Sequence, residues 1–160
     1  MDKIEQSLAD LGFKLPPPFA VPEPMQDMFS MVKVVGNRCV VSGHAPLNSE
    51  GGIAQPLGQL GSSLTVEQGV EAAHLTALAM LSSLKSELGS LDRITDWVKV
   101  LGMVNSAPGF DQQTPVINGF SDTISKVFGP EKSRPTRSAV GMASLPFNIP
   151  VEVEAELLVS

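Results

Sequence analysis

The sequence is poor in the residues that bind metals or form disulfides. It contains one cysteine, Cys39, and two histidines, His44 and His74. A structural zinc site normally takes four Cys or His ligands, and these three residues stand at no ligand spacing. A single cysteine excludes an internal disulfide, and this usage is typical of a reducing compartment. We therefore expect no metal, no cofactor and a cytoplasmic location.

Basic residues and long apolar runs are also scarce. The chain has 11 Lys and Arg against 17 Asp and Glu, a net charge of −6. A nucleic-acid-binding surface needs clustered Lys and Arg, so nucleic acid is disfavoured as a main partner. No apolar run is long enough to span a bilayer. The N-terminus is amphipathic and mixed in charge, unlike a signal peptide. We expect no membrane partner.

What is present is typical of a globular protein. Of the 160 residues, 42% are hydrophobic and 18% are charged, which predicts one domain over residues 1–160. Ile4 and Leu8 fall on one face of a short helix predicted over residues 1–13. Five prolines then crowd the segment LPPPFAVPEP at 15–24, which predicts an extended connector. Residues 1–28 are thus expected to form an N-terminal helical extension.

A hairpin and a long helix follow. β-branched runs on either side of Gly36-Asn37 predict two strands joined by a tight turn. A glycine-rich polar loop with room for one short strand comes next. Thr65 and Gln68 form a capping-box pattern, which predicts the start of a helix ending at Leu88, just before Gly89.

The C-terminal half alternates strands with one more helix. Residues 97–104 predict a buried strand, and Thr114-Pro115 predicts a helix with proline at its first position. That helix would bury Ile117, Phe120, Ile124 and Phe128. Strands over 137–143 and 151–159 complete the chain. This order predicts an α+β fold, a mixed sheet with two helices packed on one face. Its uncovered face favours self-association.

Arg137 is the first candidate for a ligand site. It opens a strand directly after a loop and shares a face with the small residue Ala139, which leaves room above the sheet. A guanidinium there can present its planar fork to a carboxylate. The alternative is a strand-end arginine that pairs with a surface carboxylate or faces water.

Glu152, Gly43 and His44 are further candidates with ordinary alternatives. Glu152 can position or deprotonate a water, or belong with Glu154 and Glu156 to a solvated strand face. Gly43 can let a ligand approach the backbone, or end a strand in a turn. His44 can shuttle a proton, or be a polar loop residue.

Two asparagines are also candidates for lining a pocket. Asn105 opens the distinctive loop NSAPGF, and Asn118 lies in the first turn of the second long helix. Asparagine in a loop more often serves turn geometry, so both interpretations stay open.

Several motifs together resemble the RidA/YjgF family of enamine/imine deaminases, in its longer chorismate-mutase-like branch. The resemblance runs from about residue 30 to the C-terminus, and its most specific part is the C-terminal block. The motifs are GN at 36–37, VVSG at 40–43, TVEQG at 65–69, VKVLGMVNSAPGF at 98–110, VING at 116–119, RSAVG at 137–141, LP at 145–146 and VEVEA at 151–155.

The resemblance implies a chorismate-mutase-like fold and a homotrimer with clefts between subunits. It implies that Arg137 binds the substrate carboxylate and that the Glu152 carboxylate positions the hydrolytic water. Gly43 and Asn118 would line the cleft. The implied reaction is hydrolysis of 2-aminoacrylate-type enamines and imines to 2-keto acids and ammonia, as in a 2-iminobutanoate/2-iminopropanoate deaminase. The implied partner is a small carboxylate substrate.

Three positions in the same cleft depart from the family pattern. Phe29 stands where the deaminases carry tyrosine, His44 where they carry glutamine, and Ala139 where they carry cysteine. A second hypothesis therefore stays open, a non-catalytic trimeric module that binds small carboxylates or keto acids. A third hypothesis is the endoribonuclease activity after which some relatives are named. The excess of acidic over basic residues argues against it.

Overall fold

The protein is built on one five-stranded mixed sheet, seen in a computed structural model that describes residues 2–160. The strand order is β1-β2-β5-β3-β4. β3 and β4 run parallel, and the other neighbouring strands run antiparallel. The bounds are β1 (Val32–Val35), β2 (Arg38–His44), β3 (Ile94–Asn105), β4 (Thr136–Met142) and β5 (Val151–Val159).

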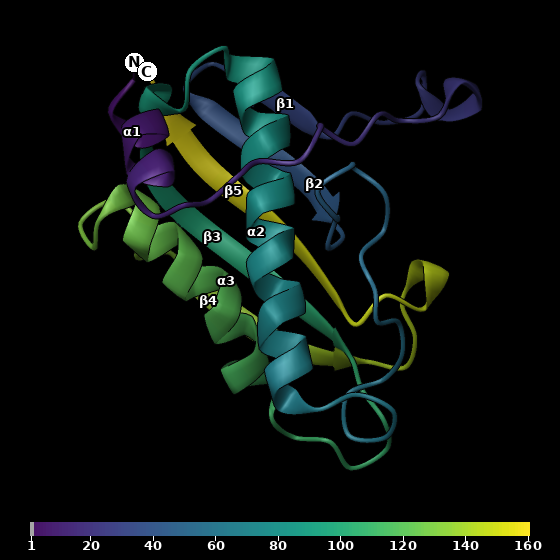
Figure 1. Ribbon diagram of the computed structural model, residues 1–160. Helices are drawn as coiled ribbons and strands as arrows, with labels where there is room; N and C mark the ends of the chain where they lie inside the picture. The colour runs from purple at the N-terminus through teal and green to yellow at the C-terminus, as the bar shows by residue number, and fades with distance from the viewer. Residues whose placement is uncertain (1) are drawn as a thin grey trace.

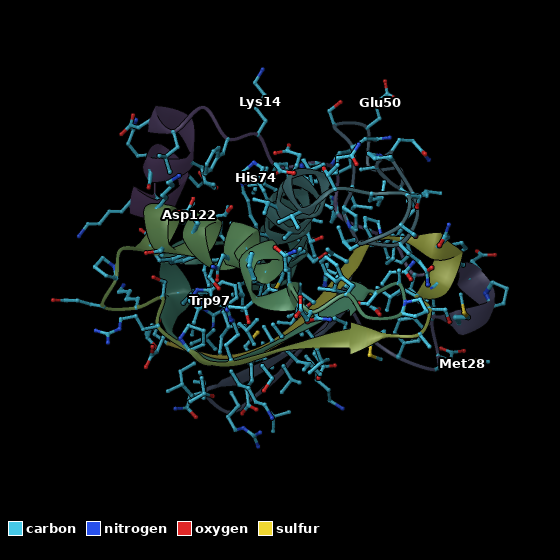
Figure 2. All side chains as sticks on the ribbon, turned by 90° about the horizontal axis from the view of Figure 1, so that it is seen from below. Lys14, Met28, Glu50, His74, Trp97 and Asp122 are labelled. Atoms are coloured by element: carbon cyan, nitrogen blue, oxygen red, sulfur yellow. The ribbon has the colours of Figure 1, made fainter. Side chains whose placement is uncertain are left out.

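Both long helices cover the same face of this sheet. α2 (Val66–Leu88) and α3 (Gln113–Phe128) lie side by side above it, as Figures 1 and 2 show from two directions. The short helix α1 (Lys3–Asp10) packs against α3 and the 3₁₀ helix η2 (Leu91–Arg93). The predicted α+β class, with two helices on one face, is confirmed. None of the helices within residues 2–160 is long and apolar enough to cross a membrane.

α2 begins where its capping box predicts. The Gln68 N–H donates to Thr65 Oγ1 over 3.2 Å, and the Thr65 N–H donates to Gln68 Oε1 over 2.9 Å. These two bonds satisfy donors that the first turn of a helix leaves free. α3 crosses α2 closely at Gly119, where an added Cβ would lie 3.0 Å from the carbonyl carbon of Val70. Only glycine permits that approach.

α3 begins earlier than predicted. Its first residue is Gln113, so Pro115 occupies the third position rather than the first, and the prediction is wrong by two residues. Proline is tolerated there because no N–H of the first turn has a partner within the helix. The Gln113 side chain donates to the Phe110 carbonyl over 2.8 Å and ties the helix start to the preceding loop. The four predicted core residues of α3 are all buried.

The core lies between the sheet and the helices. Trp97 is buried on β3, between the sheet and α3 (Figure 2). Its ring meets Phe120 and Phe128 of α3 edge-on at centroid distances of 6.0 and 5.7 Å. β5 alternates as predicted: every second residue from Val151 to Val159 is buried, and the glutamates lie on the opposite face together with Leu158. That opposite face carries the exposed side chains of Val40 and Val140 and no helix of residues 2–160.

The N-terminal segment crosses over α2 before it enters the sheet (Figure 1). It has no helix or strand from Phe13 to Pro22, as the proline run predicts. Ser82 of α2 donates its hydroxyl to the Pro16 carbonyl over 2.6 Å, and Phe13 packs on His74. Residues 19–29, which include the 3₁₀ helix η1 (Glu23–Met25), then reach outward and are mostly exposed. We call residues 19–29 the arm.

Candidate functional site

A cavity of about 480 Å³ lies where β2 ends and β5 begins. Three parts of the chain form its wall: the arm, the end of β2 with the loop after it, and the turn before β5. The lining residues are Phe19, Pro22, Met25, Phe29, Met31, Ser42, Gly43, His44, Ala45, Leu47, Ile53, Pro146, Phe147, Ile149 and Glu152. The structure thus brings together four of the predicted site residues, namely Phe29, Gly43, His44 and Glu152.

Glu152 and Gly43 are in direct contact in this pocket. A Cβ added at Gly43 would lie 2.9 Å from the carboxyl carbon of Glu152, so any larger residue at position 43 would displace the Glu152 carboxyl from its place against the backbone. Burial, and after it the charge of Glu154, raises the pKa of the Glu152 carboxyl. A carboxylate whose pKa moves toward neutrality is a better proton acceptor and donor at physiological pH.

A bulge in β2 creates this contact. Val41 pairs with Ala155 and His44 with Val153, so the two residues between them on β2 face a single residue on β5. A bulge bends its strand and changes where side chains point. Here it presents the Gly43 backbone to Glu152 and turns the His44 ring toward α2.

His44 is a buried strand residue, so the alternative of a polar loop residue is wrong. Its Nδ1 lies 2.7 Å from the Ser42 carbonyl, which can only accept, so Nδ1 carries the proton. The Ser83 hydroxyl then donates to Nε2 over 2.9 Å. Burial lowers the pKa of His44 to about 4, so the ring is neutral. With both nitrogens engaged, the ring offers neither a proton nor a lone pair to the pocket.

Arg137 belongs to a second group of residues, at the sheet edge. It lies on the outermost strand β4 and faces α3. Its Nη1 donates to Asn118 Oδ1 and to Ser121 Oγ, both over 2.9 Å. Since Nη1 carries these two bonds, Nε and Nη2 remain for a ligand. Ala139 follows on the same face, and no carboxylate within residues 2–160 pairs with the guanidinium. Of the two alternatives for Arg137, pairing with a surface carboxylate is thus not seen in residues 2–160, and the guanidinium bonds to α3 instead.

The two groups lie on opposite faces of the sheet. Arg137 is level with Val100 of β3, and Glu152 is level with Met103 three residues along the same strand. Arg137 contacts α3 on the covered face, whereas Glu152 lies on the uncovered face of β5. With β3 between them, the two side chains of one chain cannot contact the same small molecule.

Asn105 belongs to neither group. It is the last residue of β3 and is buried, and its amide nitrogen donates to Asn148 Oδ1 over 3.0 Å and to the Ile149 carbonyl over 3.1 Å. It therefore supports the turn behind the pocket wall. Phe147 and Asn148 in that turn have positive φ angles of 56° and 57°.

Several site residues were missed from the sequence. Ser121 could have been found, because it lies three residues after Asn118 on the same helix face. Phe147 and the arm residues give no such signal, because their place at the pocket depends on contacts between distant segments. Among residues 2–160, no three His, Cys, Asp or Glu side chains gather in a way that could hold a metal ion.

A mixed sheet with this strand order, covered by two helices, places the protein in the chorismate-mutase-like α+β class. The model of the family described as Endoribonuclease L-PSP matches residues 21–158. The chain belongs to this family, which is also the RidA/YjgF family.

Three relatives illustrate the match. Protein TCP17 of Trypanosoma cruzi is 44% identical over 153 residues, which cover 96% of this chain and 92% of the relative. Protein Atu1372 of Agrobacterium tumefaciens is 38% identical with a TM-score of 0.87, over 99% of this chain and 94% of its own. E. coli TdcF with bound serine is 20% identical with a TM-score of 0.58, over 91% and 94%, and shares the fold.

Proposed function

We propose that this protein hydrolyses small reactive 2-imino acids, and their enamine tautomers of the 2-aminoacrylate type, to 2-keto acids and ammonia. Family membership supports a RidA-like role. The observation that carries the proposal is the Glu152 carboxyl, half-buried against the Gly43 backbone in a largely apolar pocket, with its pKa raised. Such a group can take a proton from water and return it to nitrogen.

The reaction needs few groups, because an imine carbon is already electrophilic. The Glu152 carboxylate takes a proton from a water molecule as the water oxygen forms a bond to the imine carbon. The π electron pair moves to nitrogen, which receives the proton from Glu152. The resulting carbinolamine then loses ammonia as its hydroxyl gives up a proton and becomes the keto oxygen. Orientation of the substrate supplies most of the remaining acceleration.

Orientation is the role we assign to Arg137. Its Nε and Nη2 hold the substrate carboxylate in a bidentate pair, while Asn118 and Ser121 fix the guanidinium through Nη1. Since Arg137 and Glu152 lie on opposite faces of one sheet, the complete site takes Arg137 from one subunit and Glu152 from a neighbour. We therefore propose a homotrimer with sites between subunits, in which the uncovered sheet faces are buried.

A second function is favoured by two residues of this site. Phe29 brings no hydroxyl to the pocket, and Ala139 brings no thiol beside Arg137. A trimer that binds small carboxylates or keto acids without turnover needs neither group. This binding module would keep the arginine grip on a carboxylate and lack the hydrolytic step.

Release of keto acid from freshly generated imines decides between the two functions. An amino acid oxidase supplies the imines of several amino acids, and the protein is expected to accelerate keto-acid release above the spontaneous rate. Glu152→Gln should remove the acceleration, whereas Glu5→Gln, on α1 in a surface ion pair with Lys85, should keep it. Binding of keto acids without any acceleration by the wild type would establish the binding module instead.

A further inference from the structure

The pocket beside Glu152 is larger and more apolar than a 2-aminoacrylate needs, since that molecule has only a methylene beyond its reacting carbon. We propose that the preferred substrates are 2-imino acids with bulky apolar side chains, of the kind derived from leucine, methionine or phenylalanine. This inference rests on the proposed function and specifies its substrate class. A cavity of about 480 Å³ lies within the usual range of small-molecule sites.

The polar groups that line the pocket are already occupied. The Ser42 hydroxyl donates to the Ser30 carbonyl over 2.6 Å, and both nitrogens of His44 are bonded inside the protein. Glu152 is the one ionisable group of the lining without such a bond in residues 2–160, and the reaction uses it. A polar substrate side chain would lose its bonds to water and gain few in return. The pocket therefore favours an apolar side chain.

Phe147 is an unusual residue of the pocket wall in both its exposure and its backbone conformation. Its side chain is 77% exposed although it is large and apolar, and its backbone lies in the left-handed region, with φ 56°. That conformation is costly for a residue with a Cβ and persists only where the surroundings impose it. Here Asn105 braces the turn from behind, and the Gly58 N–H donates to the Asn148 carbonyl over 2.9 Å. The turn thus fixes the backbone from which the Phe147 side chain lines the pocket.

The arm forms the pocket wall that faces Phe147, and this wall is also apolar. Its pocket residues are apolar and carry exposed side chains, namely Phe19, Pro22, Met25 and Phe29. Apolar surface of this kind gains free energy when a ligand removes it from water. The methionine side chain also adapts to several apolar shapes. A branched or aromatic substrate side chain would lie between the arm and Phe147, with its reacting carbon beside Glu152.

The test compares kcat/KM for the imines of leucine, methionine, phenylalanine and alanine, each generated by an amino acid oxidase. One methylene in an apolar pocket changes kcat/KM by about tenfold, and the leucine side chain has three more carbons than that of alanine, so the leucine imine should exceed the alanine imine by roughly 1,000-fold. Phe147→Ala and Phe29→Ala should each reduce this ratio about tenfold. Leu11→Ala, an exposed apolar residue after α1 and outside the pocket, should leave the ratio unchanged.

The outcomes separate this inference from the proposed function. If the alanine imine is hydrolysed as fast as the leucine imine, the inference is wrong and the deaminase function stands. If no imine is hydrolysed, calorimetry with 4-methyl-2-oxopentanoate and pyruvate decides. Tighter binding of the branched acid, weakened by Phe147→Ala, would support the substrate class in a binding module. Equal binding of the two acids, or no binding, would overturn it.

Discussion

Glu152 and Glu154 lie two residues apart on the same face of β5. Burial of Glu152, and after it the charge of Glu154, raises the pKa of the Glu152 carboxyl. A base works only when deprotonated, so kcat/KM should fall as the pH drops through this raised pKa. Glu154→Gln removes one cause of the shift, and the acid limb of the pH profile should then move to lower pH.

The control for this profile is Glu5→Gln, because Glu5 lies on α1 and does not contribute to the shift at Glu152. Its profile should coincide with that of the wild type. An acid limb that stays in place in Glu154→Gln would show that another group controls the profile, and Glu152 would lose its assignment as the base.

The proposed sharing of sites between subunits predicts complementation. Arg137→Ala and Glu152→Gln should each be inactive alone, and mixed trimers should recover activity, because some sites combine Arg137 of one chain with Glu152 of another. Random assembly of equal amounts restores roughly a quarter of the sites. The measurement is keto-acid release after the two variants are unfolded and refolded together, with light scattering to give the mass.

Two results would contradict this arrangement. A stable monomer at micromolar concentration would remove the trimer, and with it the site that needs two chains. Trimers that stay inactive after mixing would show that both residues must come from the same chain.

Removal of Arg137 should abolish the binding of pyruvate and 2-oxobutyrate. The loss is expected to be about 2–5 kcal/mol, because a charged pair inside a cleft loses one partner. Arg137→Lys should not restore binding, because an ammonium lacks the planar fork that Asn118 and Ser121 orient. Titration calorimetry measures both variants.

Glu152→Gln is the matched comparison for Arg137→Ala. It should keep carboxylate binding and lower turnover by about two to four orders of magnitude, as expected for loss of a general base. If Arg137→Ala leaves binding and turnover intact, the whole site assignment is wrong.

Short sequence patterns predicted the helices and strands well, but they predicted the candidate site only in part. The capping box at Thr65, the Gly36-Asn37 turn and the alternation of β5 each depend on neighbouring residues, and each is confirmed. The contact of Gly43 with Glu152 depends on β5 lying between β2 and β3, and on a bulge in β2. Neither strand order nor bulge is encoded in a short window, so the residues alone indicated candidates without their partners.

His44 and Asn105 show a related limit: the sequence marked both as candidates but did not indicate which groups their side chains would contact. Both were predicted as lining residues, and in both the polar side-chain contacts lie within the protein. His44 is buried by α2, and Asn105 is buried by the turn at 146–148. A sequence pattern does not reveal either contact. The family resemblance supplied roles for Arg137, Glu152 and Asn118 that spacing alone left open.

His44 should make the protein less stable in mild acid. Its pKa in the folded protein is about 4, against 6.5 as the reference, so the unfolded chain binds the proton more tightly. Stability from this group is complete above pH 6.5 and is lost as the pH falls toward 4. The loss is roughly 3 kcal/mol. Denaturant unfolding of His44→Gln should show a weaker pH dependence over this range, and an unchanged slope would contradict the assignment.

RNA should not bind at physiological salt. The net charge is −6, whereas phosphate binding needs clustered cations. A mobility-shift titration with single-stranded RNA is expected to show no complex. A shift that weakens steeply with added salt would instead favour the ribonuclease activity that the family description names.

The arm and Phe147 form the pocket wall without being part of the hydrophobic core. Substitutions at positions 19–29 change the shape of the pocket while the packing of the sheet against α2 and α3 stays as it is. Related chains can therefore diverge in substrate preference at little cost in stability. A change at Gly43, by contrast, would move the Glu152 carboxyl itself, because the two are in contact.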